Sequence, residues 1–335
     1  MIAVWVLLAA CVGGKDTDRG SGKSDDSGAS SPFVVVADEI PGGVLLGAWP
    51  TGDELLMVGG DLDLLNPAYG SLARWNGEAL CVEEGVTDTT LWWIHGRDPI
   101  EWYAVGAEGR ILHESGGSRT DESVPTASTL YGVWMADDGK VYAVGGDVRD
   151  SLRGEIWVKE GGVWSLFAGD LDGVVFKVWD RWFVGDGVAF HLEDGELVSR
   201  PPPDGVRLLT VRGRADDDVW AVGGDPAAVL LHWDGTQWND VAVSLDCTAQ
   251  PLNGVWTGAG EDVWIAGNSG AMARFDGSAW ECPVPPTSYE SFHAVTSFKD
   301  EIWWLGGNLF SAGNNYGTLA RYGADSEPLE VGACP

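Results

Sequence analysis

The side chains that carry most enzyme chemistry do not form a catalytic motif in this sequence. None of the 5 histidines stands at the spacing of zinc ligands, and no Gly-x-Ser-x-Gly motif presents a serine nucleophile. Basic residues do recur at equivalent positions of a repeat: Arg74, His113, His191, His232, Arg274 and Arg321. Because equivalent positions of a repeat lie far apart in space, we expect these residues to pair with a nearby acid or to stack on an aromatic ring. The sequence therefore favours a protein without catalytic activity.

Polar and aromatic residues gather in three insertions between repeated segments, at 61–69, 147–153 and 308–316. The candidate ligand-binding residues in them are Asp61, Asp63, Asn66, Tyr69, Asp147, Arg149, Asn308, Phe310, Asn314 and Tyr316. Carboxylates, amides and aromatic rings in this combination suit a carbohydrate, a peptide or Ca²⁺. The alternative is that these are surface loops whose sequences have drifted without a ligand.

A repeat of seven units must position these insertions. Its signature is an aromatic residue or Leu, any residue, an aliphatic residue and Gly, as in Trp220 to Gly223. The signature begins at Leu56, Tyr103, Tyr142, Trp182, Trp220, Trp264 and Trp303. Successive signatures lie about 40 residues apart, which is the size of a four-stranded propeller blade. The sequence predicts an all-β fold, a single seven-bladed β-propeller with four-stranded antiparallel blades.

Composition agrees with many short strands packed through flat side chains. The chain contains 48 Gly and 19 Trp, and glycine disfavours long helices. The repeat places His95 and His293 in the innermost strands, but neither has partners at ligand spacing. Tandem tryptophans stand at 92–93 and 303–304, and strand alternation predicts that one of each pair faces the opposite way. We consider both pairs candidate platforms for stacking sugars.

The chain is strongly acidic, with 51 Asp and Glu against 20 Lys and Arg and a net charge of −31. Such a charge repels nucleic acid and anionic lipid surfaces, and it attracts metal ions or basic partners. Solubility of a tryptophan-rich surface and adaptation to a salty habitat are two further explanations, and the sequence does not separate them.

The N-terminal segment predicts the cellular location of the protein. Residues 2–10 are apolar, and Leu8 to Cys11 (Leu-Ala-Ala-Cys) resembles the lipobox of bacterial lipoproteins. The resemblance implies a signal peptide at 1–10, a lipidated Cys11 opening a Gly/Ser/Asp-rich tether at 11–32, and the propeller at 33–335. We therefore expect a monomer in the cell envelope, at the outer membrane or cell surface, that touches the membrane through its lipid only.

The repeats themselves resemble the Trp-rich Val-Trp-x-Val-Gly propeller repeats of bacterial surface lipoproteins. They are distantly similar to sialidase-type Asp-box repeats, which place one residue between Asp and Gly. Here Asp and Gly are adjacent, at 234–235 and 276–277. The resemblance therefore implies the propeller architecture and not sialidase chemistry.

Four cysteines remain beside the one in the lipobox. Cys81 and Cys282 follow a third-strand aromatic residue by six and seven residues, while Cys247 and Cys334 follow theirs by 14 and 12. A late cysteine can thus meet the early cysteine of the next blade, which predicts disulfides Cys247–Cys282 and Cys81–Cys334. The alternative is four free thiols. Residues 33–36 could also close the ring as a strand on the last blade, and strand and disulfide closure stay open at this point.

The sequence as a whole favours a non-catalytic binding or scaffolding module for a protein or glycan partner on the face with the long loops. The first alternative is a glycoside-active or lyase-type propeller enzyme, which needs a close Asp/Glu pair in the central channel. The second is a Ca²⁺-dependent adhesion protein using Asp61, Asp147 and Asp225. No cofactor other than Ca²⁺ is implied.

Overall fold

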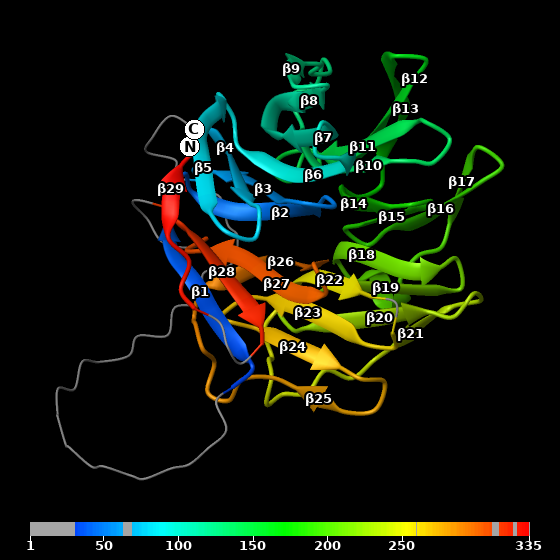
Figure 1. The fold of residues 1–335 in the computed structure, drawn as a ribbon. Helices are drawn as coiled ribbons and strands as arrows, with labels where there is room; N and C mark the ends of the chain where they lie inside the picture. Colours follow the sequence, from blue (N-terminus) through cyan, green and yellow to red (C-terminus); the bar gives the residue numbers. More distant parts are fainter. Residues whose placement is uncertain (1–30, 63–68, 259, 310–314, 324–326, 335) are drawn as a thin grey trace, which may run out of the picture.

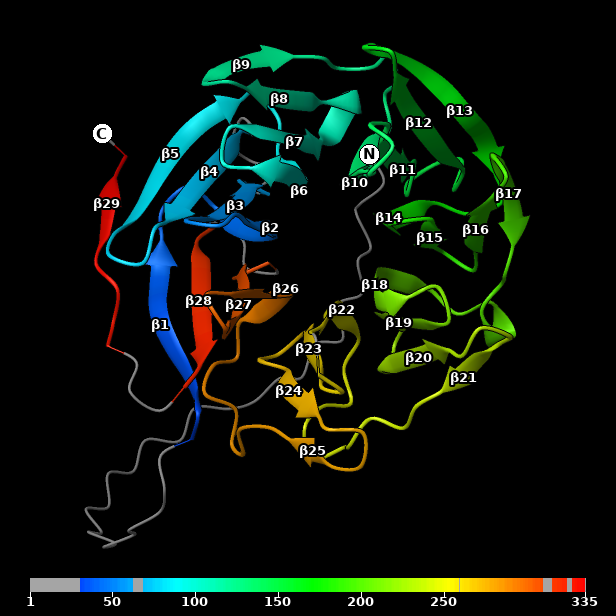
Figure 2. The same ribbon diagram turned by 45° about the vertical axis from the view of Figure 1, so that its right-hand side comes forward.

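The computed structural model describes residues 31–62, 69–258, 260–309, 315–323 and 327–334, and these form seven sheets arranged in a ring (Figures 1 and 2). The predicted seven-bladed β-propeller is confirmed. Two short 3-10 turns, η1 (Ala107–Gly109) and η2 (Pro203–Gly205), interrupt the strand pattern. Within the described ranges, no helix has the length and apolar character needed to cross a membrane.

The first three blades follow one another along the chain. Blade 1 contains β2 (Val44–Pro50), β3 (Leu55–Gly60), β4 (Gly70–Trp75) and β5 (Leu80–Thr87). Blade 2 contains β6 (Leu91–Asp98), β7 (Glu101–Gly106), β8 (Ile111–Ser115) and β9 (Ser118–Asp121). Blade 3 contains β10 (Thr129–Met135), β11 (Val141–Gly146), β12 (Gly154–Glu160) and β13 (Val163–Leu171). The first strand named in each blade is its inner strand.

The next blades repeat this order. Blade 4 contains β14 (Val175–Trp179), β15 (Trp182–Gly185), β16 (Ala189–Glu193) and β17 (Glu196–Ser199). Blade 5 contains β18 (Leu208–Ala215), β19 (Asp218–Gly223), β20 (Val229–Trp233) and β21 (Trp238–Asp240). Blade 6 contains β22 (Leu252–Thr257), β23 (Val263–Gly267), β24 (Met272–Phe275) and β25 (Trp280–Glu281).

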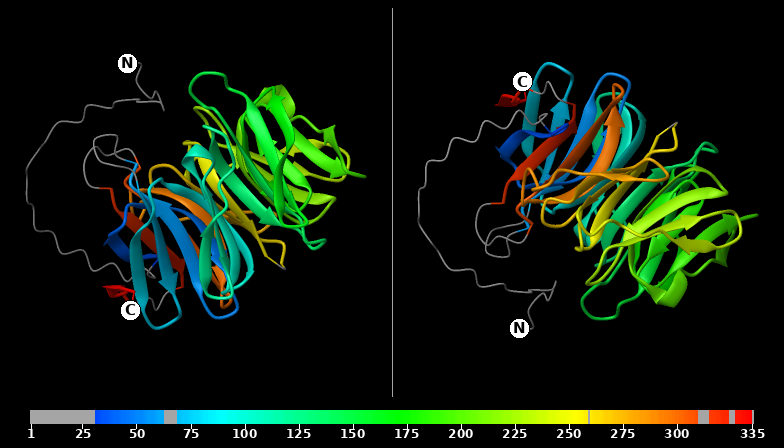
Figure 3. Two further views of the ribbon diagram at one scale, coloured as in Figure 1. Left: turned by 90° about the horizontal axis from the view of Figure 1, so that it is seen from above. Right: turned by 90° about the horizontal axis from the view of Figure 1, so that it is seen from below.

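Blade 7 is built from both ends of the described chain. It contains β26 (Ser291–Phe298), β27 (Glu301–Gly307), β28 (Gly317–Tyr322) and, as its outer strand, β1 (Phe33–Ile40), which pairs antiparallel with β28. In blade 1, β29 (Val331–Ala333) adds a fifth, parallel strand to β5 at the rim of the ring (Figure 3). The ring is therefore closed by strand pairing at two places.

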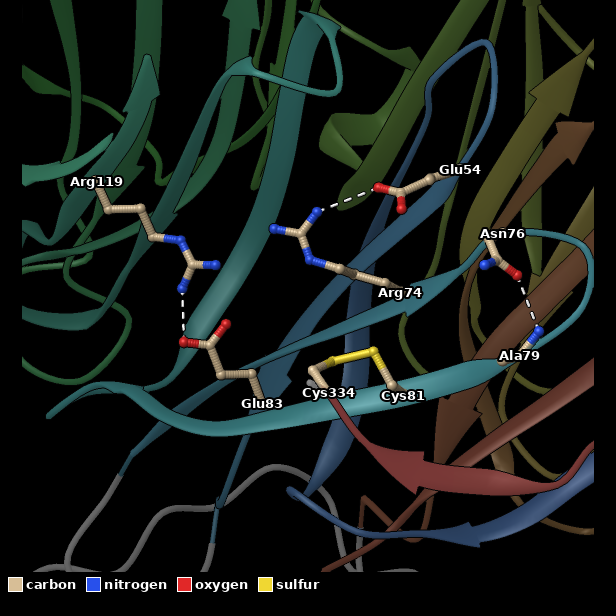
Figure 4. Close-up of a disulfide and its surroundings, with 8 residues drawn as sticks. All are labelled: Glu54, Arg74, Asn76, Ala79, Cys81, Glu83, Arg119 and Cys334. Atoms are coloured by element: carbon tan, nitrogen blue, oxygen red, sulfur yellow. Dashed lines mark hydrogen bonds and ion pairs between the residues drawn. A yellow bond between two sulfur atoms is a disulfide. The ribbon is translucent and has the colours of Figure 1, made fainter. Parts of the chain in front are cut away.

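Both predicted disulfides are present. Cys81–Cys334 joins β5 to the residue after β29 and spans 253 residues of sequence (Figure 4). Cys247–Cys282 joins the segments that follow β21 and β25 and spans 35 residues. Strand closure and disulfide closure, which the sequence left open, thus occur together.

The glycine of each repeat signature is required by close packing of the backbone. A Cβ atom on Gly59 would lie 1.8 Å from the Val44 carbonyl oxygen, and one on Gly306 would lie 1.9 Å from the Ser291 carbonyl oxygen. No side chain fits at such distances, so the second strand of each blade can approach its inner strand only through glycine. The same contact explains why this position recurs in all seven units.

The third-strand bases have the structural role that the sequence predicted. Arg74 pairs with Glu54 at 3.2 Å (Figure 4), and the His232 ring stacks on Trp220 while its Nε2 lies 2.8 Å from Asp218. Acidic partners also face the other four: Glu101 and Glu122 for His113, Glu193 for His191, Asp262 for Arg274 and Glu301 for Arg321. Each pair ties a third strand to an acid nearby in the sequence.

The core lies between neighbouring blades, where side chains of adjacent sheets interdigitate. Leu56 and Val58 of blade 1, for example, pack with Ile94 and Trp102 of blade 2. Most tryptophans are core residues of this kind, as expected. Both members of the pair at 303–304 are fully buried, so the expectation that they form an exposed sugar platform is wrong.

A β-bulge interrupts the inner strand of every blade. The bulged residues are Leu46, Trp92, Tyr131, Phe176, Leu209, Asn253 and His293. A bulge breaks the two-residue alternation of side chains. The ring centroid of Trp92 lies 6.0 Å from that of His293 in blade 7, and the centroid of Trp93 lies 3.9 Å from Lys177 Nζ in blade 4. Both tryptophans of blade 2 thus reach a residue two blades away, which places both side chains toward the channel. The prediction that Trp92 and Trp93 face opposite ways is therefore wrong.

Candidate functional site

The loop face is the end of the ring that carries the insertions between second and third strands. Four of the ten predicted ligand-binding residues lie outside the described part of the chain: Asp63, Asn66, Phe310 and Asn314. Of the other six, Asp61 and Asn308 are buried, with 7% and 5% of their surface exposed. The insertions of blades 1 and 7 meet, because the Leu62 backbone N–H donates to Asn315 Oδ1 at 2.9 Å.

The described polar groups of these two insertions bind one another. The backbone N–H of Tyr316 donates to Asn308 Oδ1 at 2.7 Å. Its hydroxyl donates to Glu290 Oε1 at 2.8 Å, and this hydrogen bond raises the pKa of Tyr316 to about 12. The Asp61 backbone N–H donates to the Tyr69 carbonyl at 3.1 Å. Internal hydrogen bonds therefore hold the insertions in shape.

The insertion of blade 3 is built around one carboxylate. Asp147 accepts the backbone N–H groups of Arg149, Asp150 and Ser151 at 2.8 to 3.1 Å, and these bonds lower its pKa to about 2. Asp225, the third carboxylate considered for Ca²⁺, pairs with Arg207 at 3.4 Å. Among the described residues, no group of three His, Cys, Asp or Glu side chains could hold a metal ion.

The central channel has a different character. Its wall consists of the seven inner strands (Figure 2). At the end where hairpins join each first strand to the second, all seven blades line a cavity of about 30 Å³. We call this end the hairpin mouth. It lies opposite the loop face, because the insertions leave the far ends of the second strands.

The hairpin mouth presents one residue from an equivalent position of each blade. Each of these residues pairs across the hairpin with the first residue of a repeat signature. In chain order they are Trp49, His95, Trp134, Trp179, Arg212, Trp256 and Thr296. Five of them line the cavity through stacked aromatic and cationic groups, and we call this set the channel cage: Trp49, His95, Trp134, Arg212 and Trp256.

His95 lies between two indole rings, with ring centroids 4.2 Å from Trp49 and 3.9 Å from Trp134. The Met135 backbone N–H donates to its Nδ1 at 2.9 Å. Burial and the nearby Arg212 charge lower the pKa of His95 well below its usual value, so the ring is neutral. Because Nδ1 accepts, Nε2 must carry the hydrogen. That N–H is buried and has no acceptor among the described residues.

Arg212 is the charged member of the channel cage. Its guanidinium carbon lies 4.3 Å from the Trp256 ring centroid and 5.7 Å from that of Trp134. Burial lowers its pKa to about 10, so it remains a cation at neutral pH. No described residue forms a hydrogen bond or an ion pair with Arg212. The indole N–H groups of Trp49 and Trp256 are buried and likewise lack an acceptor among the described residues.

A second layer of basic groups lies deeper in the channel. Lys177 is buried, with its Nζ donating to the Tyr131 carbonyl at 2.6 Å and lying over the Trp93 ring. Burial lowers the pKa of Lys177 to about 7. His293 lies 2.6 Å from the Leu46 carbonyl through Nδ1, and burial together with the Lys177 charge lowers its pKa to about 3.

The inner strands, all of them described, carry a single acidic residue, Asp98, which is exposed at the end of β6. The enzyme alternative needed a close Asp/Glu pair in the channel, and these strands do not provide one. A wholly apolar channel is not found either, because basic and aromatic groups line it. The arrangement can hold an electron-rich group, but it offers no carboxylate to act as acid or base.

The channel cage does not follow from the motifs and spacings of the sequence. His95 was noted, but its partners come from other blades and have no fixed spacing from it. One sequence signal does mark the cage. In most blades, the cage position lies about eight residues before the first residue of the repeat signature, with which it pairs across the hairpin. Reading that column down the seven repeats would have shown basic and aromatic residues together, including Arg212.

Comparisons with known proteins agree with this fold. No family model matches the chain, and no curated protein does. A structure of YCF48 bound to a D1 peptide is similar, with a TM-score of 0.62 and 16% identity over 88% of this chain and 98% of that one. The WD40 β-propeller domain of Doa1 gives a TM-score of 0.61 and 10% identity, over 87% of this chain and 97% of its own.

A third similar structure is the extracellular domain of the hybrid two-component system BT4673 from B. thetaiotaomicron. Its TM-score is 0.61 at 11% identity, over 88% of this chain and 40% of that one. Identities this low establish the architecture alone. The class of the protein is thus a seven-bladed β-propeller, and its function has to be argued from the site.

Proposed function

We propose that this propeller is a non-catalytic binding module that holds a segment of a protein partner at the hairpin mouth. The observation that carries the proposal is the channel cage, where stacked aromatic rings surround hydrogen-bond donors that no described residue engages. Flat indole rings give a partner large contact area at low entropy cost, and the donors fix its orientation. The YCF48 structure, which holds a D1 peptide, supports a peptide as the kind of ligand.

The proposal moves the site away from the loop face. There, Tyr316, Asn308 and Asp147 already form internal hydrogen bonds, so a ligand would have to compete with them. At the hairpin mouth, the N–H groups of His95 and Trp256 have no acceptor in the part of the chain that the structure describes. A ligand gains more from unengaged buried donors than from groups that are already satisfied.

The anchor forms part of the same proposal. Cys11 in its lipobox-like context would hold the module in the cell envelope, facing outward through the tether at 11–32. Two disulfides support an oxidising compartment, because cytosolic proteins seldom keep such bonds. Replacing Cys11 with Ala is expected to move the protein from the membrane fraction to the soluble fraction. Unchanged fractionation and continued lipid labelling would contradict the anchor.

Photo-crosslinking tests the binding site. Benzoylphenylalanine in place of Trp256 is expected to capture a polypeptide from envelope extracts, which mass spectrometry then identifies. The matched control places the same probe at Tyr316 on the loop face, where we expect no specific capture. Capture at Tyr316 and not at Trp256 would return the site to the loop face. A glycan array with the same protein tests the glycan alternative directly.

A further inference from the structure

We propose that the channel cage binds a single carboxylate group, with the Arg212 guanidinium as its charged donor and the His95 Nε2–H and Trp256 Nε1–H as neutral donors. The carboxylate is either that of a small free acid or one carried by a polypeptide. The inference does not depend on the proposed function, because a cage that binds a free carboxylate needs no protein partner.

The charge balance of the chain makes the surroundings of Arg212 unusual. The chain has 51 acidic residues for 20 basic ones, so carboxylates are not scarce. Arg274 illustrates the usual outcome, since it stacks on Trp264 and also pairs with Asp262 at 3.0 Å. Arg212 stacks on Trp256 in the same manner but has no described carboxylate partner. Arg212 is only partly buried at the mouth, so its charge, which no described carboxylate pairs, is accessible to an anion supplied from outside.

The polar groups of the channel cage are hydrogen-bond donors. Arg212 offers only donors, His95 presents its donor nitrogen, and the indoles of Trp49 and Trp256 are donors. Buried indole N–H groups without acceptors also occur inside the blades, at Trp102, Trp182 and Trp303. Indoles alone therefore do not define the site. The site is defined by indole N–H groups, a cation and a neutral imidazole N–H around one cavity. This combination fits a ligand that only accepts hydrogen bonds.

The size and shape of the cavity match a carboxylate group. The cavity of about 30 Å³ has room for roughly two water-sized atoms, since one needs about 10–15 Å³ on this measure. A carboxylate presents two such oxygens in a plane, which matches the fork of a guanidinium group. Phosphate and sulfate carry four oxygens, more than this volume holds at once. Trp49, Trp134 and Trp256 are partly exposed, so the remainder of a ligand can extend out of the mouth.

Acetate and its neutral isostere acetamide test the inference on the whole disulfide-bonded protein. Titration of [1-¹³C]acetate followed by NMR is expected to show saturable binding and a rise in Tm, whereas acetamide at equal concentration leaves Tm unchanged. Arg212→Met is expected to weaken acetate binding about tenfold or more, since a charge-assisted hydrogen bond is lost. Arg274→Met, the matched control on the third strand of blade 6, is expected to bind acetate like the wild type.

Trp256→Phe gives a second variant in case Arg212→Met does not fold. It keeps the aromatic ring and removes one N–H donor, so acetate binding is expected to weaken a fewfold. The tripeptide Gly-Gly-Phe, with a free or an amidated C-terminus, distinguishes the sources. Binding of the free form only assigns the cage to a polypeptide carboxylate, and binding of acetate without either peptide assigns it to small acids. Equal effects of acetate and acetamide, or an unchanged acetate affinity in Arg212→Met, would overturn the inference.

Discussion

Basic side chains in this propeller fall into two regions with opposite surroundings. On the third strands, Arg74 and Arg321 lie 3.2 and 2.9 Å from carboxylate oxygens of their own blades. In the channel, Lys177 and Arg212 face aromatic rings and a backbone carbonyl, without a described acidic partner. The chain has far more acidic than basic residues, so a shortage of carboxylates does not explain why the channel cations lack a described acidic partner.

Geometry within a blade explains the outer pairs. Register places Arg74 opposite Leu56, only two residues from Glu54, so acid and base meet as soon as the blade forms. The channel groups instead face residues of other blades, where Lys177 of blade 4 meets Trp93 of blade 2. Outer charges therefore stabilise single blades, whereas channel charges become unfavourable only when the ring assembles. An unpaired charge in the channel does not stabilise the fold, so its presence there indicates a function.

The largest expected effect comes from opening the ring on which the channel depends. Cys81→Ser combined with Cys334→Ser is expected to lower the free energy of unfolding by about 3–5 kcal/mol, because the bridge closes 253 residues. Urea unfolding measures the loss. Removing Cys247–Cys282, which closes 35 residues, is the control, and its loss should be about 2 kcal/mol smaller. Equal losses would show that loop closure does not govern the effect.

Lys177 tests the channel side of the comparison. Its pKa of about 7 lies below the ordinary 10.5, so the unfolded chain binds more protons between these pH values. Wild-type stability should therefore rise as pH increases from 7 toward 10.5. Lys177→Met is expected to remove this slope and to gain about 3 kcal/mol near pH 6, where the buried charge is fully present. Thermal unfolding across this pH range measures both.

Lys159 is the matched outer lysine, since its Nζ lies 2.6 Å from Glu122 and 3.0 Å from the Tyr103 hydroxyl. These partners raise its pKa despite the opposing effect of burial. Lys159→Met should therefore lower stability by about 1–2 kcal/mol at neutral pH. A loss of stability in both lysine variants would mean that the channel lysine is paired in solution.

The two arginines repeat the contrast with a smaller expected difference. Without added carboxylate, Arg212→Met is expected to be as stable as the wild type or about 1 kcal/mol more stable, because a partly desolvated cation without a described carboxylate partner is removed. Arg274→Met should lose about 1 kcal/mol through its pairs with Asp262 and Glu281. Urea unfolding in carboxylate-free buffer compares them, and a clear destabilisation by Arg212→Met alone would reverse the comparison.

The smallest expected effect concerns Asp147 on the loop face, whose carboxylate is stabilised by backbone N–H groups and not by an opposite charge. Asp147→Asn is expected to cost less than 1 kcal/mol at pH 7. Since its folded pKa is about 2, the wild-type advantage is present above pH 4 and disappears as pH falls through 2. Asp150→Asn in the same turn is the control and should be neutral. A pH-independent difference between the two variants would contradict the role of the Asp147 carboxylate.

Much of the architecture could be read from local pattern. Gly59 and its six equivalents marked the blades, because backbone contact forbids a Cβ there. The disulfides followed because the blade repeat fixes where each cysteine falls. The pair at 303–304 was misjudged, since burial depends on the neighbouring blade. The predicted orientation of the Trp92 side chain was wrong, because a rule of strict two-residue alternation does not include β-bulges. Lipidation of Cys11 and the boundaries at 10 and 32 stay predictions.

The sequence by itself determined the number of blades, and it predicted both disulfides and a local partner for each third-strand base, because these features arise between residues within one repeat or the next. Only the tertiary structure decided the channel cage. His95, Arg212 and Trp256 come from three blades and are brought together by the closing of the ring, so no local spacing encodes their contact. The missing counter-ion of Arg212 is likewise a property of the assembled channel, where neighbouring inner strands supply aromatic rings in place of acids.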